Sequence, residues 1–547
     1  MKKMMGLILL LVLAFSSIVG CSSDNKNAET SKPASSESVD SKSPVSTEGT
    51  GSDNSTGGLA LPIVDDGSVT LTVAINDNWY SQKSYKDNLP VMQQLEKRTG
   101  VKINWEVTPG EQFKDVMRLR VAAAKSKALP DIIRVPDSAV KLGAEGLIIP
   151  LNDLIDKYAP NIKKFYEEHP EIYKSRLDVD GNLYALDDIT GANTNPYGFL
   201  IRKDWLDKLN LQAPTNLDEW YTVLKAFRDH FDGVIPFMPF EGKEGLMMFG
   251  NALGLQLTYF NSGYTLDANG KLVHGLTQPE GKQLYEFLHK LYSEKLIPAD
   301  YENVSEDQQL ALIAQGKVGA INQFLMATPR YNNADPKGEA DWILIDPPAN
   351  AGYEPFYNAE PIFQAAYGIS KDSKNPEVAI KWLDYFYASE EGIRLRGLGV
   401  EGLSYNMVNG KPEFTDLIKN NPDKLDPGTA LMSIGALTTL PSIQLGEGIY
   451  AEGPQALLGL NPKLAETSNR VKPYLVDVYP FALATPEEEA EVRDLNQDIK
   501  TYSLEMSAKF ISGQESLDNW DKYIDTLKKL KLDRVTEIFQ QRLDRVK

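Results

Sequence analysis

Cysteine is almost absent from this sequence, because the 547 residues contain only one, Cys21. A single cysteine excludes an intramolecular disulfide and a zinc site built from several cysteines. Histidine is also scarce, and the four present have no spacing typical of metal ligands: His169, His230, His274 and His289. The sequence has no glycine-rich phosphate loop ending in Lys-Ser/Thr, no HExxH motif and no GxSxG motif. These absences do not favour an enzyme.

Basic residues are too few to balance the acidic ones, with 57 Lys and Arg against 76 Asp and Glu and a formal net charge of −19. Removal of Lys2 and Lys3 with a leader peptide takes this charge from −19 to −21, because each carries one positive charge. A chain this acidic is a poor partner for nucleic acid and for anionic lipid headgroups. We therefore expect the folded surface itself not to bind a membrane.

Long apolar runs are confined to the start of the chain, where Met4 to Gly20 (MMGLILLLVLAFSSIVG) follows Lys2 and Lys3. This run is too short and too weakly flanked for a stop-transfer helix, so residues 1–20 are predicted to be a signal peptide. The last three residues of this run and the cysteine that follows, Ile18-Val19-Gly20-Cys21, form a four-residue motif that resembles a bacterial lipobox. That resemblance implies a diacylglycerol on Cys21, and several acyl chains on one residue give stable anchoring. The alternative is an ordinary secretory peptide in which Cys21 is incidental.

Residues 22–68 are mostly Ser, Thr, Gly, Asn, Asp, Glu, Lys and Pro, with almost no large apolar residue before Leu59. Such a segment cannot bury enough surface to offset the entropy of ordering it. We predict a lipidated cysteine and disordered tether over 21–68. The folded body then begins at Val69 and is too long for a single core, so two lobes are expected.

The body opens with alternating element types. Period-two patterns predict strands at 69–75, 101–107 and 131–135, and apolar spacings of three and four predict helices at 88–100 and 111–127. This order is typical of a parallel sheet with helices on its faces. Ligands bind beyond the carboxyl ends of the strands in such sheets, which here precede the segments 76–80 and 134–137.

The end of the chain is predicted to be helical. Thr485, Pro486 and Glu488 form the capping-box signature at the start of a helix over 485–513, which Gly513 would end. A second helix is expected over 517–530. Further back, 197–227 reads as a strand and two helices, with Asp204 and Asn216 as the expected caps.

Several short sequence segments of the body resemble those of the extracellular solute-binding proteins of carbohydrate ABC importers, in the large lipoprotein group that includes alginate-oligosaccharide binders. The segments are LPDIIRV (129–135), DGNLYAL (180–186), YGFLIRKDWLDKLNLQAPTNLDEWYTVLKAF (197–227), WLDYFYASEEG (382–392) and AKFISG with NWDKY (508–523). The resemblance covers residues 69–547. It implies an α/β, two-lobe periplasmic-binding-protein-like fold of type II, each lobe a sheet flanked by helices, with a helical C-terminal region.

The resemblance also implies how the chain divides between the lobes. We expect an N-terminal lobe from 69–192 and 323–390, and a C-terminal lobe from 193–322 and 391–547. The hinge crossings are expected near Asp187–Thr194, near Ala320–Phe324 and around 385–400. A sugar would bind in the cleft between the lobes, which would close by bending at these crossings.

Aromatic and planar polar side chains are the groups that a sugar needs, because its C–H faces stack on rings and its hydroxyls need polar partners. The candidate ligand-binding residues are Trp79, Tyr80, Arg134, Asn193, Trp205, Glu241, Gln323, Phe324 and Tyr357. Packing in a core is the alternative for each aromatic, and it is favoured slightly for Trp205. Trp79 and Tyr80 stand in a polar loop that offers no apolar face to join.

The loop DVDGNLY (178–184) has Asp178, Asp180 and Asn182 at alternate positions, as in an EF-hand calcium loop, and Asp187 could assist. Glycine falls two positions early, at Gly181, and the bidentate Glu of that loop is missing. The favoured alternative is a β-hairpin whose tip is Asp180-Gly181. DANGKL (267–272) is a second predicted hairpin tip.

These observations favour a lipid-anchored receptor on the outer face of the cell membrane that captures an oligosaccharide and delivers it to ABC transporter permease subunits. It would be a monomer, need no cofactor, and require a separate permease and ATPase. A receptor for a non-sugar solute such as a peptide is one alternative. The other is a cell-surface glycan-active enzyme, because two of the 76 acidic residues could meet at the separation that glycosidases use.

Overall fold

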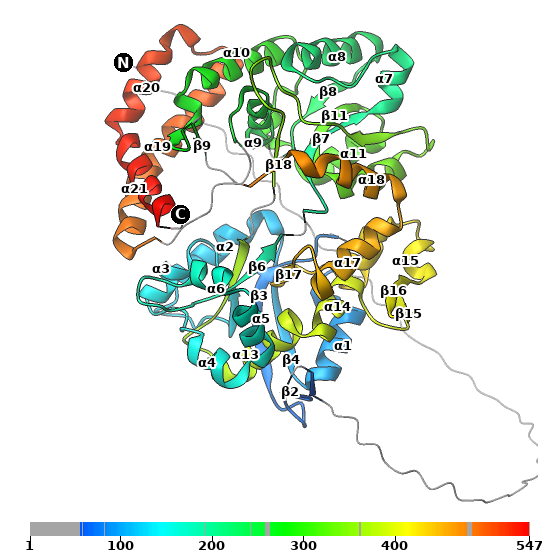
Figure 1. Cartoon of the computed structure of the whole chain (residues 1–547), viewed down its shortest axis with the longest axis vertical. Coiled ribbons are helices and arrows are strands. Elements are labelled where there is room, and N and C mark those ends of the chain that lie inside the picture. The colour runs from blue at the N-terminus through cyan, green and yellow to red at the C-terminus, as the bar shows by residue number, and fades with distance from the viewer. Residues whose placement is uncertain are drawn as a thin grey trace, which may run out of the picture. The chain divides into compact units, whose positions relative to one another are not determined.

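The computed structural model describes residues 55–56, 58–80, 82–191, 193–240, 242–257, 263–267, 269–359, 363–477 and 484–545 (Figure 1). The predicted signal peptide, Cys21 and most of the predicted tether lie outside these residues. The expectation that the tether runs to residue 68 is wrong, because Leu59 is buried in the core of the six-stranded sheet. Within the described part of the chain, no helix is both long and apolar enough to span a membrane. Two large hydrophobic cores organise the described residues, and each is built around its own sheet.

The first sheet has six strands in the order β17-β6-β14-β5-β3-β4. Its strands are β3 (Thr70–Asn76), β4 (Lys102–Thr108), β5 (Ile132–Arg134), β6 (Leu186–Thr190), β14 (Phe363–Ile369) and β17 (Ile443–Gln444). Strand β3 pairs in parallel with both β4 and β5, which confirms the predicted parallel unit. The late strand β14 then inserts antiparallel between β5 and β6, so the complete sheet is mixed.

Helices cover this sheet. They are α1 (Pro90–Thr99), α2 (Gly110–Ala122), α3 (Ala139–Ala144), α4 (Asn152–Tyr158), α5 (Pro160–Glu168), α6 (Pro170–Arg176), α13 (Pro376–Ala388), α14 (Glu390–Leu398), α15 (Asp416–Lys419), α16 (Pro427–Ser433) and α17 (Gly448–Gly459), together with the 3-10 turn η1 (Tyr85–Asp87). A hairpin of β15 (Tyr405–Val408) and β16 (Lys411–Phe414) and a short pair of β1 (Ser55–Thr56) and β2 (Leu59–Ala60) complete this part.

Helix α1 begins one residue later than its sequence suggests. Asn88 does not cap it, because Asn88 adopts the left-handed conformation that ends η1 and Pro90 takes the first helical position. Gly100 ends α1 with φ +69°, as predicted.

The second sheet has four strands in the order β12-β7-β11-β8. They are β7 (Tyr197–Arg202), β8 (Ile235–Met238), β11 (Val318–Phe324) and β12 (Trp342–Leu344). Its helices are α7 (Lys203–Leu209), α8 (Leu217–His230), α9 (Lys243–Met247), α10 (Pro279–Ser293), α11 (Glu306–Ala314), α12 (Thr328–Ala334) and α18 (Pro462–Val471). The strands β13 (Tyr357–Asn358) and β18 (Leu475–Val476) pair in parallel beside it.

Two caps in this region test the local predictions. The Asn216 side chain accepts from the Glu219 N–H and caps α8 as expected. Asp204 does not cap α7, since it lies inside the first turn and accepts from the Arg202 guanidinium instead. The DANGKL segment joins β9 (Tyr264–Leu266) to β10 (Leu272–His274), which confirms that predicted hairpin.

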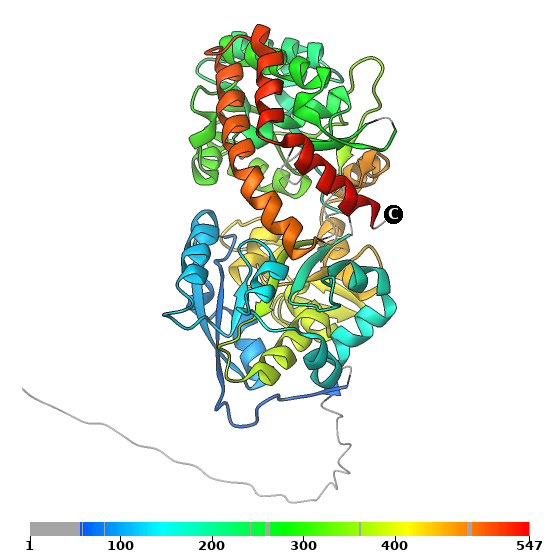
Figure 2. The ribbon, with the colours of Figure 1, turned by 90° about the vertical axis from the view of Figure 1, so that its left-hand side faces the viewer.

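Three C-terminal helices lie against the second core (Figure 2). They are α19 (Pro486–Ser512), α20 (Trp520–Lys529) and α21 (Leu532–Asp544). The α19 capping box is formed as predicted, because the Thr485 hydroxyl accepts from the Glu488 N–H and the Glu488 carboxylate accepts from the Thr485 N–H. Gly513 ends the helix in the left-handed conformation.

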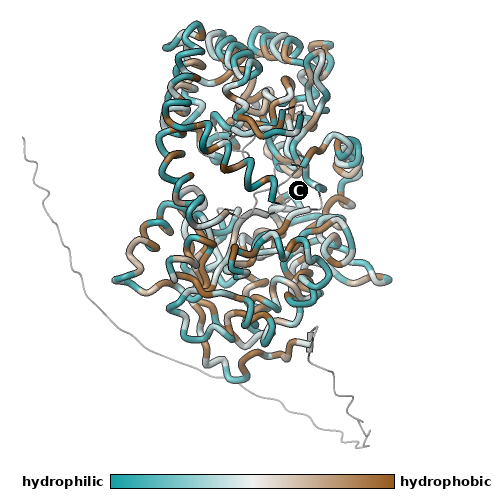
Figure 3. Tube along the Cα trace, turned by 60° about the vertical axis from the view of Figure 1, so that its left-hand side comes forward, coloured by the Kyte–Doolittle hydropathy of each residue, from teal (hydrophilic) through white to brown (hydrophobic). Residues whose placement is uncertain are grey.

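The two cores divide the chain differently from the expected boundaries. Figure 3 shows that hydrophobic residues, in brown, recur along the whole folded trace and so do not mark a boundary. Side chains from 325–357 pack in the core of the four-stranded sheet, and side chains from 395–443 pack in the core of the six-stranded sheet. The expected crossings at 320–324 and 385–400 are therefore wrong. The first is an interior strand, β11, and the second is filled by α13 and α14. Similarity over short sequence segments does not reveal which core a segment joins, because both cores are built from the same types of apolar residue.

Candidate ligand-binding site

The carboxyl ends of β3 and β5 bring two predicted polar residues together. Asn76 is the last residue of β3 and Arg134 is the last residue of β5. The Arg134 guanidinium donates to the Asn76 side-chain oxygen, and its other side lies over the Phe113 ring, 5.6 Å from the centroid. The parallel pairing of β3 and β5 places both residues at one edge of the sheet.

The loop after β3 is held by its own side chains. The Asp77 carboxylate accepts from the backbone N–H groups of Asn78 at 2.8 Å and Tyr85 at 3.1 Å. The Asn78 amide donates to the Met432 carbonyl at 2.9 Å, and its oxygen accepts from the Tyr80 N–H at 3.1 Å. Trp79 stands between these anchors and is 55% exposed. A large indole is thus presented to solvent on a loop whose backbone is fixed.

A charged cluster that the sequence did not indicate joins strand β6, the start of β17 and helix α14. Asp188 of β6 accepts from the Ser442 hydroxyl and is 4.0 Å from the Arg396 guanidinium. Burial raises the pKa of Asp188, while Arg396, the Ser442 hydroxyl and Arg134 act in the opposite direction. Burial lowers the pKa of Arg396, and Asp188 opposes that shift. The Gln444 side chain completes the cluster, with its oxygen 3.1 Å from both terminal nitrogens of Arg396 in the orientation that satisfies both groups.

Hydrogen bonds behind this edge tie the strands to one another. The Tyr367 hydroxyl donates to the Thr439 carbonyl, and the Thr439 hydroxyl donates to the Asn76 carbonyl at 2.8 Å. The Thr439 N–H donates to the Tyr85 hydroxyl at 3.0 Å. Burial raises the pKa of both tyrosines, so they stay neutral and can hold these contacts.

The four-stranded sheet has a comparable edge. Strands β8 and β11 run parallel and β7 runs antiparallel to β11, so the end of β11 pairs with the start of β7. The Asn322 amide donates to the Tyr197 hydroxyl and its oxygen accepts from the Phe240 N–H at 3.0 Å. The half-buried Phe324 ring meets the Tyr197 ring edge-on at 5.0 Å between centroids. Gln323 is buried, and its oxygen accepts from the Phe324 N–H.

Two other residues were predicted to bind the ligand in this region, Asn193 and Glu241. Asn193 lies between β6 and β7 with φ +47°, and its side-chain oxygen is buried without a hydrogen-bond partner in the described structure. Such an oxygen can accept from a ligand hydroxyl. Glu241 lies outside the described residues.

Trp205 and Tyr357 are not available to a ligand, which corrects their assignment. Trp205 is 6% exposed and its indole stacks on Phe231 at 4.2 Å. Tyr357 is fully buried, and its hydroxyl accepts from the Phe199 N–H and donates to the Ile345 carbonyl. Both side chains belong to the core of the four-stranded sheet. The sequence places them next to segment ends, but it does not show that these ends fold inward.

The residues of the predicted calcium loop are engaged in other contacts. The Asp178 carboxylate accepts from the N–H groups of Asp180 and Asn182 and from the Asn182 amide. Both Asp187 oxygens accept from the Arg176 guanidinium, at 2.7 and 2.8 Å. Among the described residues, no three His, Cys, Asp or Glu side chains are grouped as a metal requires. Calcium also takes amide and backbone carbonyl oxygens, so Asp178, Asp180 and Asn182 remain the candidate ligands of this loop.

The same loop is a turn at Asp180-Gly181, but the expected hairpin is wrong because no strand flanks it. Helix α6 ends at Arg176 and β6 begins only at Leu186. The Asp178 N–H donates to the Asn182 carbonyl and closes the turn, and Gly181 has φ +85°.

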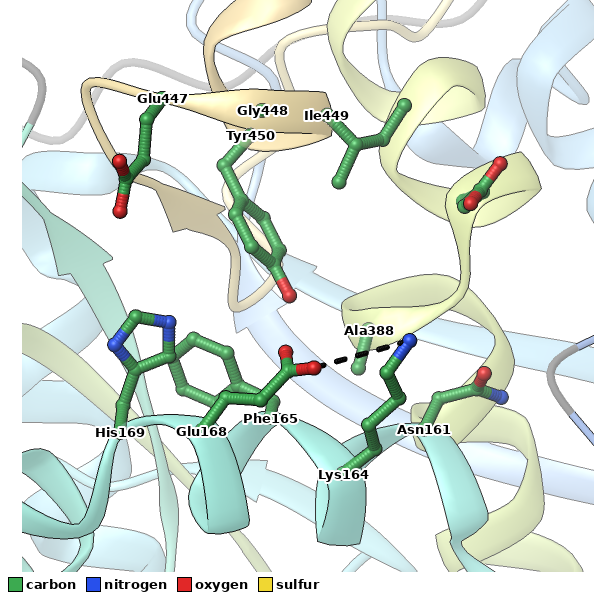
Figure 4. Close-up of a pocket in the computed structure, with 11 residues that line it drawn as sticks. Asn161, Lys164, Phe165, Glu168, His169, Ala388, Glu447, Gly448, Ile449 and Tyr450 are labelled. Carbon is green, nitrogen blue, oxygen red and sulfur yellow. Dashed lines mark ion pairs between the residues drawn. The ribbon is translucent and has the colours of Figure 1, made fainter.

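A separate cavity of about 620 Å³ lies between helix α5 and the start of α17, two of the helices that cover the six-stranded sheet (Figure 4). Helix α5 supplies Phe165, Glu168 and His169, and the start of α17 supplies Glu447 and Tyr450. The Tyr450 side chain points toward Glu168, which pairs with Lys164 at 3.9 Å. Its rim is formed by exposed charged side chains, and none of the predicted ligand residues lines it.

Two helix-flanked sheets with separate cores, each with polar side chains at one edge, define a two-lobe binding-protein fold of the periplasmic type. The chain belongs to the family of bacterial extracellular solute-binding proteins, which matches residues 80–393. The solved structures that resemble it share the two-lobe fold. The calcium-free crystal structure of the alginate-binding protein AlgQ2 has a TM-score of 0.73 and 26% identity, over 89% of this chain and 100% of that one.

Curated relatives extend the likeness over most of the chain. The fructooligosaccharide ABC transporter substrate-binding protein FusA of Streptococcus pneumoniae serotype 4 is 25% identical over 89% of this chain and 92% of its own length. Its structure in complex with kestose has a TM-score of 0.71, with 22% identity over 87% of this chain and 99% of that one. The polygalacturonan/rhamnogalacturonan-binding protein YtcQ of Bacillus subtilis strain 168 is 26% identical over 65% of this chain and 71% of its own. These relatives are binding proteins, which agrees with the expectation that the chain is not an enzyme.

Proposed function

We propose that this protein is a lipid-anchored extracellular receptor that captures an oligosaccharide and delivers it to the permease of an ABC importer. The single observation that carries the proposal is the exposed Trp79 on a fixed loop, three residues beyond the Asn76–Arg134 pair at the carboxyl edge of the sheet. An aromatic face beside planar polar groups is the combination that a sugar ring needs, with apolar area from the indole and orientation from hydrogen bonds. The names of FusA, AlgQ2 and YtcQ support the ligand class.

In this proposal the ligand lies in a cleft between the two lobes. Trp79, Tyr80 and Arg134 would contact it from the six-stranded sheet. The contacts from the other lobe would come from Asn193, Glu241, Gln323 and Phe324. Segment 191–196, which joins β6 to β7, would be one of the hinges, and closing would exclude water from the hydrogen bonds.

The anchor and the partners belong to the same proposal. Cys21 would carry the lipid, and the segment between Cys21 and β1 would tether a monomeric body outside the cell membrane. One curated relative, 26% identical over 65% of this chain, is named lipoprotein LipO of Bacillus subtilis strain 168. Binding would require no cofactor, and a structural calcium would be held by Asp178, Asp180 and Asn182, because the Asp187 carboxylate is already paired with Arg176.

Isothermal titration calorimetry tests the proposal on the full chain with Cys21→Ser, using kestose, trigalacturonate and a tripeptide as probes. We expect at least one oligosaccharide to bind and the tripeptide not to bind. Small-angle scattering should then show a smaller radius of gyration with the bound sugar. Binding of the tripeptide alone would support a non-sugar receptor. Cleavage of a sugar during long incubation would support the glycan-active enzyme instead.

A further inference from the structure

Two guanidinium groups, those of Arg134 and Arg396, share the buried Asp188 carboxylate at the carboxyl edge of the six-stranded sheet. Among the described residues, the hydrogen bond of Arg134 goes to the neutral Asn76 side chain, its guanidinium lies over the Phe113 ring, and Asp188 acts on it only through its charge. No carboxylate of the described chain lies within 4.0 Å of the Arg134 guanidinium. A guanidinium carries five N–H donors in a rigid fork, so most of its donors lack a protein acceptor.

The acidic side chains around this edge are already engaged. Asp188 bonds to Ser442 and faces Arg396. Asp77 accepts from two backbone N–H groups. Asp137, three residues after Arg134, accepts from Arg118 at 2.6 to 3.2 Å. The protein therefore leaves the half-buried Arg134 guanidinium without a carboxylate of its own, because Asp188 is shared with Arg396.

The geometry points to an acidic ligand: we infer that the captured oligosaccharide contains uronic acid residues and that Arg134 selects it by binding a sugar carboxylate. This inference rests on the proposed function and adds the substrate class. A carboxylate is planar and accepts two parallel N–H bonds from one guanidinium, whereas a sugar hydroxyl offers no such pair of acceptors. Trp79 follows Asn76 by three residues on the same edge and supplies the stacking face for the ring that bears the carboxylate.

The net charge of −19 does not oppose this assignment. At physiological ionic strength the Debye length is about 8 Å, so charges spread over a large surface contribute little inside a partly buried site. The local balance decides, and locally the single carboxylate of Asp188 stands against the two guanidinium groups of Arg134 and Arg396. Alginate and polygalacturonan, which the names of AlgQ2 and YtcQ include, are polymers of uronic acids, whereas the fructooligosaccharides of FusA are uncharged.

A matched ligand pair isolates the carboxylate. Trigalacturonate and its trimethyl ester have the same rings and hydroxyls and differ in three methyl groups that remove the charge, and kestose serves as a neutral sugar of another type. With the full chain carrying Cys21→Ser, we expect calorimetry to show trigalacturonate binding at least about tenfold more tightly than the ester. The difference should shrink at high salt, because a charge contact is screened.

Two substitutions test whether Arg134 makes the selection. Arg134→Gln should weaken trigalacturonate binding by about ten- to one-hundredfold and leave the ester nearly unaffected. Asn76→Asp keeps the guanidinium but gives it an internal carboxylate, so it should also abolish the preference for the acid. Arg493→Gln, which removes an exposed charge on α19, is the control that should change neither affinity. Melting temperatures of all variants confirm folding.

The possible results separate the inference from the function on which it rests. If kestose binds and trigalacturonate binds no better than its ester, the acidic substrate class is wrong while the sugar receptor stands. If the acid is preferred but both site variants keep that preference, Arg134 is not the selecting residue. If none of the three saccharides binds, the proposed function itself fails.

Discussion

Truncation of two tryptophans, Trp79→Ala and Trp205→Ala, separates binding from packing because the structure puts them in opposite environments. Trp79 is 55% exposed and belongs to none of the hydrophobic cores, whereas Trp205 is 6% exposed and stacked on Phe231. With slightly less than half of the indole covered, Trp79→Ala removes at most about 2 kcal/mol of transfer free energy and opens no internal cavity. Trp205→Ala should cost about 3–5 kcal/mol of unfolding free energy, because it leaves a cavity between packed rings.

The effect on binding should be the reverse. A truncated aromatic anchor commonly costs at least about 2 kcal/mol of binding free energy, so Trp79→Ala should weaken oligosaccharide affinity by roughly thirtyfold. Trp205→Ala should leave the affinity per folded molecule unchanged. Urea unfolding measures the stabilities, and calorimetry with the saccharide that binds the unmodified body measures the affinities. A Trp79→Ala protein that loses 3–5 kcal/mol of stability but binds normally would refute the reasoning and place Trp79 in a core.

Three further predictions concern the anchor, a buried carboxyl and a helix cap. Cys21→Ser should release the protein into the medium, and a variant that stays on washed membranes would contradict lipidation. Burial raises the pKa of Asp384 to about 6, while the Ile162 N–H acts in the opposite direction. Because this folded-state pKa lies above the unfolded one, Asp384 favours folding at low pH and loses that contribution as the pH rises from about 4 to about 6. The unfolding free energy of the unmodified protein relative to Asp384→Asn should thus fall by up to about 3 kcal/mol over that range in urea titrations, and a constant difference would contradict the shift. Thr485→Ala should lower the unfolding free energy by about 1 kcal/mol through loss of the α19 cap, against no change for Thr501→Ala on the exposed face of the same helix.

Local patterns were enough to predict the elements that depend on neighbouring residues. The period-two runs of β3 and β4 and the capping box of α19 involve residues a few positions apart, so their structures follow from the sequence alone. The assignment of segments to lobes failed where it depended on distant contacts. Strand β14 joins the six-stranded sheet from more than two hundred residues beyond β5, and no periodicity in either strand encodes that pairing.

The acidic pair Asp187 and Asp188 shows why the site was only half predictable. The two residues are adjacent in β6, so their side chains point to opposite faces of the sheet. Asp187 meets Arg176 from the preceding helix and makes a buried structural ion pair. Asp188 meets Ser442 and Arg396, which come from much later in the chain, and so joins the charged edge beside Arg134. The sequence offers the pair as two equivalent carboxylates, and the fold alone decides that Asp187 pairs with one arginine inside the lobe while Asp188 is shared between Arg134 and Arg396.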